Sequence, residues 1–218
     1  MQKIITADKT ESYFNEAVGE SYHSHKGAVE EAWQKYVLPC KIKELAQKGS
    51  LKILDVCFGL GYNSAAAIDA ALQENPFCLI EVVGLENDVA ILQNIQEVHP
   101  PLSCYPLYKK IISPAFTVAE KGMRVRVLLG DAREMVKTLQ ENTFDAIFFD
   151  PFSPQSSPQM WQADFFKEIQ RVMKPTAILA TYSCARIARE NMSKGGLLYE
   201  DGPIWGRRGP GTLAKKWA

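Results

Sequence analysis

The stretch LKILDVCFGLGYNSAAAIDAALQ at residues 51–73 decides the fold. Its first six residues are mostly apolar and have the length of a buried strand. GLGYN follows at residues 59–63, and its two glycines allow a tight turn. The alanine-rich segment that comes next favours a helix, which ends before Pro76 because the residue preceding a proline avoids the helical conformation. The stretch therefore predicts a strand, a tight turn and a helix in direct succession.

The same alternation of apolar strand and amphipathic helix recurs along the chain. It is typical of a parallel sheet with helices on both faces, so we predict a doubly wound α/β fold with a mostly parallel seven-stranded sheet. The tail at 197–217 lacks a helical period and is expected to supply the last strands. The predicted strands are 51–56, 79–86, 123–131, 144–150 and 177–183; the predicted helices are 27–45, 64–73, 89–98, 132–140 and 161–173, with a loop and one further helix in 102–121.

The predicted helix at 27–45 precedes the sheet and begins the main domain, which we place at residues 27–218. Residues 1–26 form an N-terminal extension. The apolar residues of the helix recur at helical spacing, and its charged residues fall on other faces. The apolar set is Ala28, Ala32, Tyr36 and Cys40, and the charged set is Glu30, Glu31, Lys35 and Lys41.

The composition excludes several classes of protein. Lysine plus arginine and aspartate plus glutamate both total 25, so net charge does not argue for a nucleic-acid partner. The five cysteines form no C-x-x-C pair and the three histidines complete no ligand cluster, so we expect neither a disulfide framework nor a metal. The N-terminus lacks the pattern of a secretory signal, and no apolar run approaches the roughly 20 residues that span a bilayer. We therefore expect a cytoplasmic protein without a membrane segment.

Polar residues or glycines stand at the ends of four predicted strands. They are Asp55 with Gly59 and Gly61, then Glu86, Asp131 and Asp150. Ligands of a doubly wound sheet bind outside the carboxyl ends of its strands, so these residues are expected to form one site. The helix starting near Asn63 offers free N–H groups to a carboxylate, Glu86 can accept from two ribose hydroxyls, and Asp131 can accept from an adenine amine. The pattern predicts a site for an adenosine with a charged amino-acid tail.

A dinucleotide site is the main competitor, because it uses the same strand order and an acidic residue on the ribose. The G-x-G-x-x-G fingerprint requires glycine at position 64, where this chain has Ser64. Pyrophosphate binding is therefore disfavoured. A purely structural role for Gly59 and Gly61 in a tight turn is the other alternative.

Five segments resemble one family in order and spacing. They are ESYHSHKGAVEEAW (20–33), ILDVCFGLGYN (53–63), DPFSPQSSPQMW (150–161), ILATYSCARIARE (178–190) and GRRGPGTLA (206–214). Together they resemble the tRNA wobble-uridine methyltransferases of the MnmC type, and the DPFSP-x-x-x-P-x-x-W string is the most specific of them. The likeness covers nearly the whole chain from Glu20 onward.

The resemblance implies a class I, Rossmann-like methyltransferase that uses S-adenosyl-L-methionine. Its reaction would methylate the primary amine of 5-aminomethyl-(2-thio)uridine at the tRNA wobble position, giving the 5-methylaminomethyl product. Members often carry a fused FAD-dependent oxidase domain; this chain looks like the stand-alone form, with no FAD. The resemblance also suggests that the segment around Tyr22 closes over the donor. The expected donor site comprises Tyr22, Ser24, Glu30, Asp55, Phe58, Gly59, Gly61, Asn63, Glu86, Asp131, Ala132 and Asp150.

The Asp150-Pro151-Phe152 motif supports amine methylation from its chemistry as well. The proline stiffens the turn, the carboxylate and nearby carbonyls can accept N–H bonds from an amine, and the phenyl ring can pack against a base or the donor. Asp150 is the expected orienting group and proton acceptor, with a helix cap or turn former as its structural alternative. These three residues are the expected catalytic set.

Contacts to tRNA must come from local basic groups, since the net charge is zero. The expected contacts are Arg186, Arg189, Arg207 and Arg208, of which the last two lie among glycines and beside Trp205. His23 and His25 can be read as bases, but exposed histidines in a polar loop are more often solvated.

Two other functions stay open. An aminopropyltransferase of the spermidine-synthase kind shares the fold, although such enzymes show an acidic D-x-x-D-like loop that DPFSP does not match. A non-catalytic donor-binding or RNA-binding module is the second. For the enzyme we expect a monomer that binds the anticodon stem-loop of tRNA.

Overall fold

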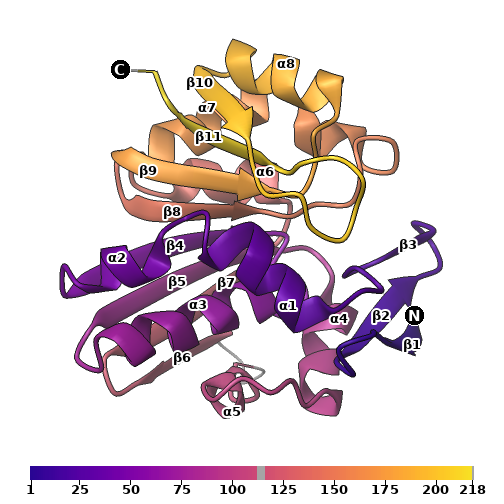
Figure 1. Cartoon of the computed structure of the whole chain (residues 1–218), viewed down its shortest axis with the longest axis vertical. Coiled ribbons are helices and arrows are strands. Elements are labelled where there is room, and N and C mark those ends of the chain that lie inside the picture. The colour runs from indigo at the N-terminus through magenta and orange to yellow at the C-terminus, as the bar shows by residue number, and fades with distance from the viewer. Residues whose placement is uncertain (112–115, 218) are drawn as a thin grey trace.

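The computed structural model describes residues 1–111 and 116–217. Its main sheet has eight strands: β4 (Ser50–Val56), β5 (Leu79–Glu86), β6 (Thr117–Glu120), β7 (Met123–Leu129), β8 (Phe144–Phe149), β9 (Met173–Thr181), β10 (Leu197–Asp201) and β11 (Thr212–Lys216). Their order across the sheet is β10-β11-β9-β8-β4-β5-β7-β6, as Figure 1 shows. The five central strands run parallel and the outer three pair antiparallel. The doubly wound, mostly parallel α/β fold is thus confirmed.

The strand count differs from the predicted seven because of β6. This strand lies in the stretch 102–121, where the sequence predicts a loop and a helix, and residues 112–115 of that stretch lie outside the described residues. β6 pairs with β7 through a two-residue hairpin, with Glu120 opposite Met123. The turn residues Lys121 and Gly122 both have positive φ angles, +49° and +81°, which is the geometry that the strand twist favours.

Helices cover both faces of the sheet. They are α1 (Ala28–Ala32), the π-helical turn η1 (Trp33–Val37), α2 (Ile42–Ala46), α3 (Tyr62–Glu74), α4 (Val89–Gln93), α5 (Tyr105–Tyr108), α6 (Ala132–Met135), α7 (Ala163–Val172) and α8 (Arg186–Lys194), with 3-10 turns η2 (Asn94–Glu97), η3 (Val136–Thr138) and η4 (Pro158–Trp161). α1 to α5 pack on one face, and α6 to α8 pack on the other. Successive strand residues alternate between the two cores; Ile53 faces the first and Leu54 the second. The predicted helix 27–45 is interrupted near Pro39, and α8 lies in a stretch for which no helix was predicted.

The N-terminal extension is an ordered small sheet. β1 (Gln2–Ile5), β2 (Glu11–Asn15) and β3 (Glu20–Ser21) pair antiparallel and lie at the carboxyl ends of the central strands (Figure 1). The hydroxyl of Tyr62 on α3 donates to the Glu11 carbonyl at 2.8 Å, which ties this sheet to the main one. Within the described residues, no helix combines the length and apolar character that crossing a membrane requires.

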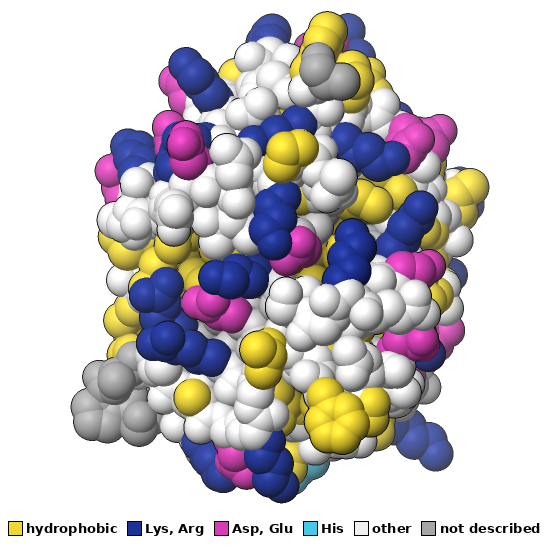
Figure 2. Space-filling view, turned by 90° about the vertical axis from the view of Figure 1, so that its left-hand side faces the viewer, with side chains coloured by type: hydrophobic (Ala, Val, Ile, Leu, Met, Phe, Trp, Pro, Cys, Tyr) yellow, Lys and Arg dark blue, Asp and Glu magenta, His cyan; other side chains and the backbone are white. Residues whose placement is uncertain are grey.

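The opposite edge, at the amino ends of the central strands, carries charges of both signs (Figure 2). Many are paired across neighbouring strands and helices, such as Lys52 with Glu81 at 2.9 Å and Lys174 with Asp145 at 2.7 Å. Exposed pairs of this kind contribute little stability, on the order of 0–1 kcal/mol. This edge therefore presents a solvated surface of mixed charge.

Candidate functional site

One cavity of about 980 Å³ opens at the carboxyl ends of the central strands. The strand register brings the predicted residues there, because Val56 lies opposite both Leu85 and Phe149, and Glu86 lies opposite Leu129. The volume is at the upper end of small-molecule sites, about 300–1,000 Å³. Its wall includes Tyr22, Ser24, Phe58, Gly59, Asn63, Glu86, Asp131, Ala132, Asp150, Pro151, Phe152 and Arg207, whereas Glu30, Asp55, Gly61, Arg186, Arg189 and Arg208 lie outside it.

The two glycines of the turn have separate roles. Gly59, at φ +55°, faces the cavity, and its N–H donates to Glu86 Oε2 at 2.8 Å. Gly61, at φ +74°, is needed for packing, because a Cβ there would meet the rings of Phe58 and Tyr108 at 2.6 and 2.7 Å. Phe58 and Tyr108 stack nearly parallel, with 5.9 Å between ring centroids. The turn thus combines a ligand-facing glycine with a structural one.

The Glu86 carboxylate organises the side of the cavity next to the glycine turn. Its Oε1 accepts from the N–H groups of Asn87 and Asp88 at 2.8 and 2.9 Å, and Oε2 accepts from Gly59. Burial raises the pKa of Glu86 above its ordinary value, against these three bonds. A carboxylate has about four lone-pair sites, so one site on Oε2 is left for a ligand hydroxyl. Two ribose hydroxyls need two free lone pairs. Both can bind Glu86 only if one of the three backbone N–H groups gives up its hydrogen bond to the carboxylate.

Two other predicted acids lie in different settings. Asp55 is fully buried at the end of β4, and burial raises its pKa to about 8. It lies outside the cavity wall, so it does not contact a ligand held in the cavity. Asp131 caps α6 by accepting from the Arg133 N–H at 2.9 Å and also binds the Arg133 guanidinium at 2.5–3.1 Å. An adenine amine at Asp131 must share the carboxylate with Arg133.

Asp150 connects the helix that follows the glycine turn with the 150–152 turn. Its Oδ2 accepts from Asn63 Nδ2 at 2.9 Å, and its backbone N–H donates to the Val56 carbonyl at 3.1 Å. Desolvation, followed by the nearby negative charge of Glu31, raises the pKa of Asp150 to about 6. Asp150 can therefore exchange a proton near neutral pH.

The carbonyls beside Asp150 are already bonded. The hydroxyl of Tyr182 donates to the Pro151 carbonyl, and Trp161 Nε1 donates to the Phe152 carbonyl, each at 2.9 Å. Both donors are buried, so they fix the turn firmly. Each of these carbonyl oxygens keeps a second lone pair, so the bonds orient the carbonyls without removing them as acceptors.

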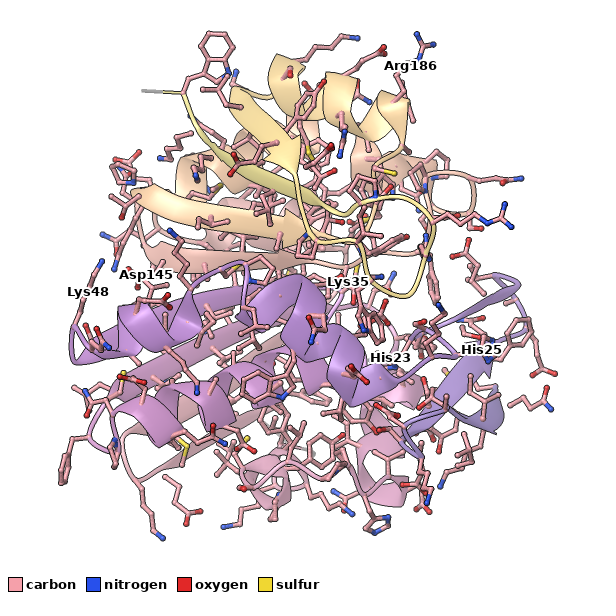
Figure 3. All side chains as sticks on the ribbon, in the orientation of Figure 1. His23, His25, Lys35, Lys48, Asp145 and Arg186 are labelled. Atoms are coloured by element: carbon pink, nitrogen blue, oxygen red, sulfur yellow. The ribbon has the colours of Figure 1, made fainter. Side chains whose placement is uncertain are left out.

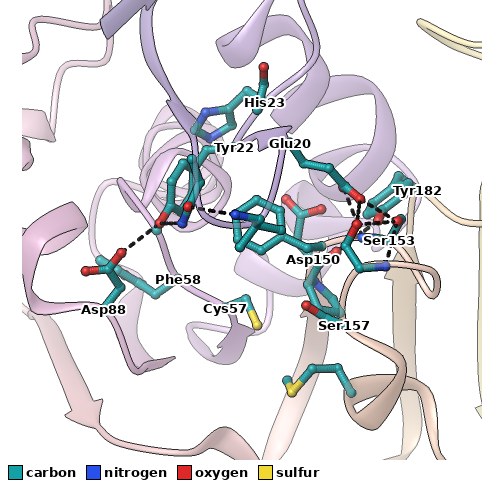
Figure 4. Close-up of a pocket in the computed structure, with 18 of the residues that line it drawn as sticks. Glu20, Tyr22, His23, Cys57, Phe58, Asp88, Asp150, Ser153, Ser157 and Tyr182 are labelled. Atoms are coloured by element: carbon teal, nitrogen blue, oxygen red, sulfur yellow. Dashed lines mark hydrogen bonds between the residues drawn. The ribbon is translucent and has the colours of Figure 1, made fainter. Parts of the chain in front are cut away.

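The N-terminal segment covers the cavity and is held on both of its sides (Figure 4). Beside the glycine turn, the Tyr22 hydroxyl donates to Asp88 Oδ2 at 3.1 Å. The Tyr22 ring lies edge-on to Phe152, with 5.1 Å between centroids. Beside the 150–152 turn, the Glu20 carboxylate accepts from the backbone N–H of Ser153 at 3.1 Å and from its hydroxyl. The cover therefore bridges the two halves of the site.

A buried ion pair borders the cavity, formed by two of the charged residues that the sequence places away from the apolar face of the helix. Lys35 is only 3% exposed, and its Nζ lies 2.7 Å from Glu31 Oε1. Glu31 Oε2 accepts from the Ser24 N–H at 2.7 Å. Glu31, not the exposed Glu30, lines the cavity. Figure 3 shows Lys35 beside the β10–β11 connection. In the sequence, the only sign of this ion pair is that Glu31 and Lys35 are four residues apart.

Residues 94–217, more than half of the chain, match the family described as S-adenosyl-L-methionine-dependent methyltransferase. The chain belongs to the S-adenosyl-L-methionine-dependent methyltransferases. The matched residues include the 150–152 turn, Asp131 and Arg207 of the cavity wall. Membership of this family agrees with the fold class and with the donor that the sequence predicts.

Individual relatives narrow the likeness further. The chain is 30% identical over 199 residues to the tRNA 5-methylaminomethyl-2-thiouridine biosynthesis bifunctional protein MnmC of Methylibium petroleiphilum, covering 84% of this chain and 29% of that protein. An uncharacterized protein of Methanocaldococcus jannaschii is 29% identical over 98% of this chain and 59% of its own length. The crystal structure of MNMC2 from Aquifex aeolicus superposes with a TM-score of 0.88 at 29% identity, covering 98% of this chain and 70% of that one. The methyltransferase is thus related to the MnmC proteins. The chain spans less than two thirds of the length of the first two relatives.

The histidines of the cover have structural surroundings. His23 is half-buried, stacks on Tyr62 with 4.9 Å between centroids, and lies 2.7 Å from the Ser12 hydroxyl through Nδ1. Burial lowers the pKa of His23 to about 4, so the ring is neutral at physiological pH. The sequence-based reading of two exposed histidines therefore holds for His25 and is wrong for His23.

The four predicted RNA-binding arginines of the methyltransferase divide into different settings. Arg207 lines the cavity, with its guanidinium 4.4 Å from the centroid of the Tyr182 ring. Arg189 is used within the fold, since it bonds Asp201, Thr212 and the Gly211 carbonyl. Arg186 and Arg208 are exposed. Across residues 1–111 and 116–217, no group of three or more His, Cys, Asp or Glu side chains is arranged to hold a metal ion.

Proposed function

We propose that this methyltransferase transfers a methyl group to the primary amine of 5-aminomethyl-(2-thio)uridine at the tRNA wobble position, giving 5-methylaminomethyl-(2-thio)uridine. The observation that carries the proposal is the Asp150 carboxylate, half-buried in the cavity wall and bonded to Asn63 of the donor turn. The names of the MnmC relatives support the choice of substrate. The proposal places the enzyme in the cytoplasm, as a monomer with tRNA as its partner and without FAD or metal.

The donor half would be held by the glycine turn and the residues around it. Gly59 allows close approach, Glu86 offers the free lone pair on Oε2, and Ala132 lies beside the edge where an adenine would lie. Tyr22 covers the turn, its ring 3.4 Å from where a Cβ on Gly59 would stand. Family membership supports S-adenosyl-L-methionine as the molecule held there.

The acceptor half would receive the amine at Asp150. The acids around it, Glu31 and Glu20, favour a cationic or amine-bearing group over an anionic one. The wall of Phe152 and Tyr182 suits the flat face of a base. A uridine with an aminomethyl arm meets both requirements.

The chemistry asks little of the protein beyond alignment and proton acceptance. The nitrogen lone pair forms the new N–C bond, while the electron pair of the breaking C–S bond stays on sulfur. Asp150 in its ionised form accepts the proton that the amine gives up, and desolvation of the carboxylate raises its pKa toward neutrality. The fixed 150–152 turn holds this carboxylate in place.

The decisive experiment supplies undermodified tRNA with S-adenosylmethionine or its decarboxylated form and analyses the wobble nucleoside by mass spectrometry. A mass gain of one methyl group on the aminomethyl nucleoside supports the proposal. Turnover of only the decarboxylated donor identifies an aminopropyltransferase instead. Donor binding without any transfer identifies a non-catalytic module.

A further inference from the structure

A second hollow of about 590 Å³ adjoins the acceptor side of the cavity. Three segments line it: the loop after the 150–152 turn, the chain from Tyr182 into α8, and the β10–β11 connection. Ser153, Tyr182 and Arg207 line both hollows, so the two are continuous. Neither the family nor the catalytic proposal assigns a ligand to this second hollow.

We propose that this hollow binds the nucleotide adjacent to the target uridine, so that the enzyme holds two consecutive residues of a single-stranded RNA loop. The inference rests on the proposed function, because the target base must occupy the main cavity. An RNA strand that places one base at Asp150 has to continue from there, and the continuous wall at Ser153 and Arg207 is the path available to it. RNA loops are recognised through such unstacked bases and their backbone.

The lining has the chemistry of a nucleotide site. Pro154, Pro210 and the half-exposed Ile187 give apolar surfaces on which a base can pack, while Gln155 offers a polar group for its edge. The lining includes no carboxylate, in contrast to the main cavity with Glu20 and Glu31. The two hollows therefore suit different parts of one substrate, the amine in the first and a base with its phosphate in the second.

The charge at the boundary also matches a phosphodiester. The Arg207 guanidinium lies over Tyr182, 4.4 Å from the ring centroid, at the boundary of the two hollows. Arg186 at the start of α8 is not part of the lining and lies 3.5 Å from Glu190, so Arg207 is the cation that faces the boundary. A phosphate that joins the two nucleotides would lie beside Arg207, where a charge-assisted bond is available.

Cys184 provides a direct test, because it is an exposed cysteine in this hollow, with Sγ 3.0 Å from where a Cβ on Gly209 would stand. The probe is a synthetic anticodon stem-loop with 5-aminomethyl-2-thiouridine at the wobble position, and iodoacetamide labelling is followed by peptide mass spectrometry. RNA at a hundred times its Kd leaves about 1% of the protein free, so alkylation of Cys184 should slow about tenfold or more. RNA binding is measured independently by fluorescence anisotropy.

A matched pair of variants provides a second readout. Ile187→Asp places a negative charge in the hollow, and Leu198→Asp places one on β10 at a residue of similar exposure, 50% against 52%. Ile187→Asp should raise KM for the stem-loop about tenfold, in the range that loss of one base contact causes, with unchanged donor affinity. Leu198→Asp should leave KM unchanged.

The outcomes separate this inference from the proposed function. RNA that binds and is methylated while Cys184 reacts at its free rate overturns the second subsite and leaves the catalytic proposal standing. Equal KM values for the two variants do the same. RNA that neither binds nor accepts a methyl group overturns both.

Discussion

Replacing Asp150 with asparagine should separate catalysis from donor binding. Asparagine keeps the shape and an oxygen that can accept from Asn63 Nδ2, so the turn remains in place. It removes the carboxylate that accepts the proton, and a positioned base contributes about 10²–10⁴-fold to the rate. We expect kcat to fall by about that factor, with the donor Kd within about threefold of the original.

The pH dependence adds a second and sharper signature. With a pKa of about 6, Asp150 is ionised at pH 7.5, and at pH 5 only about one molecule in eleven carries the charge. The base is active when ionised, so kcat should fall about tenfold between pH 7.5 and pH 5. This fall of kcat at low pH, the acid limb of the pH profile, should be absent in Asp150→Asn.

A change at Glu31 tells this limb apart from titration of the substrate amine. The charge of Glu31 raises the pKa of Asp150, so Glu31→Gln should move the acid limb to lower pH. The amine of the RNA would titrate at the same pH in both enzymes. The assay is single-turnover methyl transfer from radiolabelled donor to the synthetic stem-loop across pH 5–9, with circular dichroism to verify folding.

Three results would refute this account of Asp150. One is a loss of kcat smaller than about tenfold in Asp150→Asn, which falls short of a general base. The second is a parallel rise of donor Kd and fall of kcat, which would make Asp150 a donor ligand. The third is an acid limb that lies at the same pH in Asp150→Asn and in Glu31→Gln as in the original enzyme.

Glu86→Gln replaces a carboxylate that accepts three backbone N–H groups; donor Kd should rise about 10–100-fold by calorimetry, with kcat at saturating donor little changed. Tyr22→Ala removes the bond to Asp88 and the ring over the turn, so stopped-flow fluorescence should show faster donor release, whereas Tyr22→Phe should retain most of the original rate. Trp161→Phe leaves the Phe152 carbonyl without its donor, which should lower stability by about 1–3 kcal/mol and Tm by several degrees in calorimetry. An unchanged Tm would show that this bond does not stabilise the turn.

Local pattern was enough to predict the framework of this protein. The central strands, the glycine turn and the acids at the strand ends follow from runs of apolar residues and from single glycines, which act on their own neighbours. In a parallel sheet such strand ends must meet at one edge, so the meeting of Glu86 with Asp150 at the cavity was also predictable. Helix 27–45 shows the limit: its apolar face was predicted correctly and is buried, but the helix is broken where Lys41 adopts a left-handed conformation, with φ +56°.

Only the tertiary structure decided which of the charged residues are buried, paired or free. In the sequence, Glu31 and Lys35 fall away from the apolar face of the helix, yet the cover and the β10–β11 connection close over them. Asp55 lies near the end of β4 and Asp131 directly precedes α6, but the first is fully buried and the second is bound by Arg133. The pKa of a carboxyl group depends on desolvation and on charges brought close by segments far apart in the chain, and a single sequence does not contain those distances.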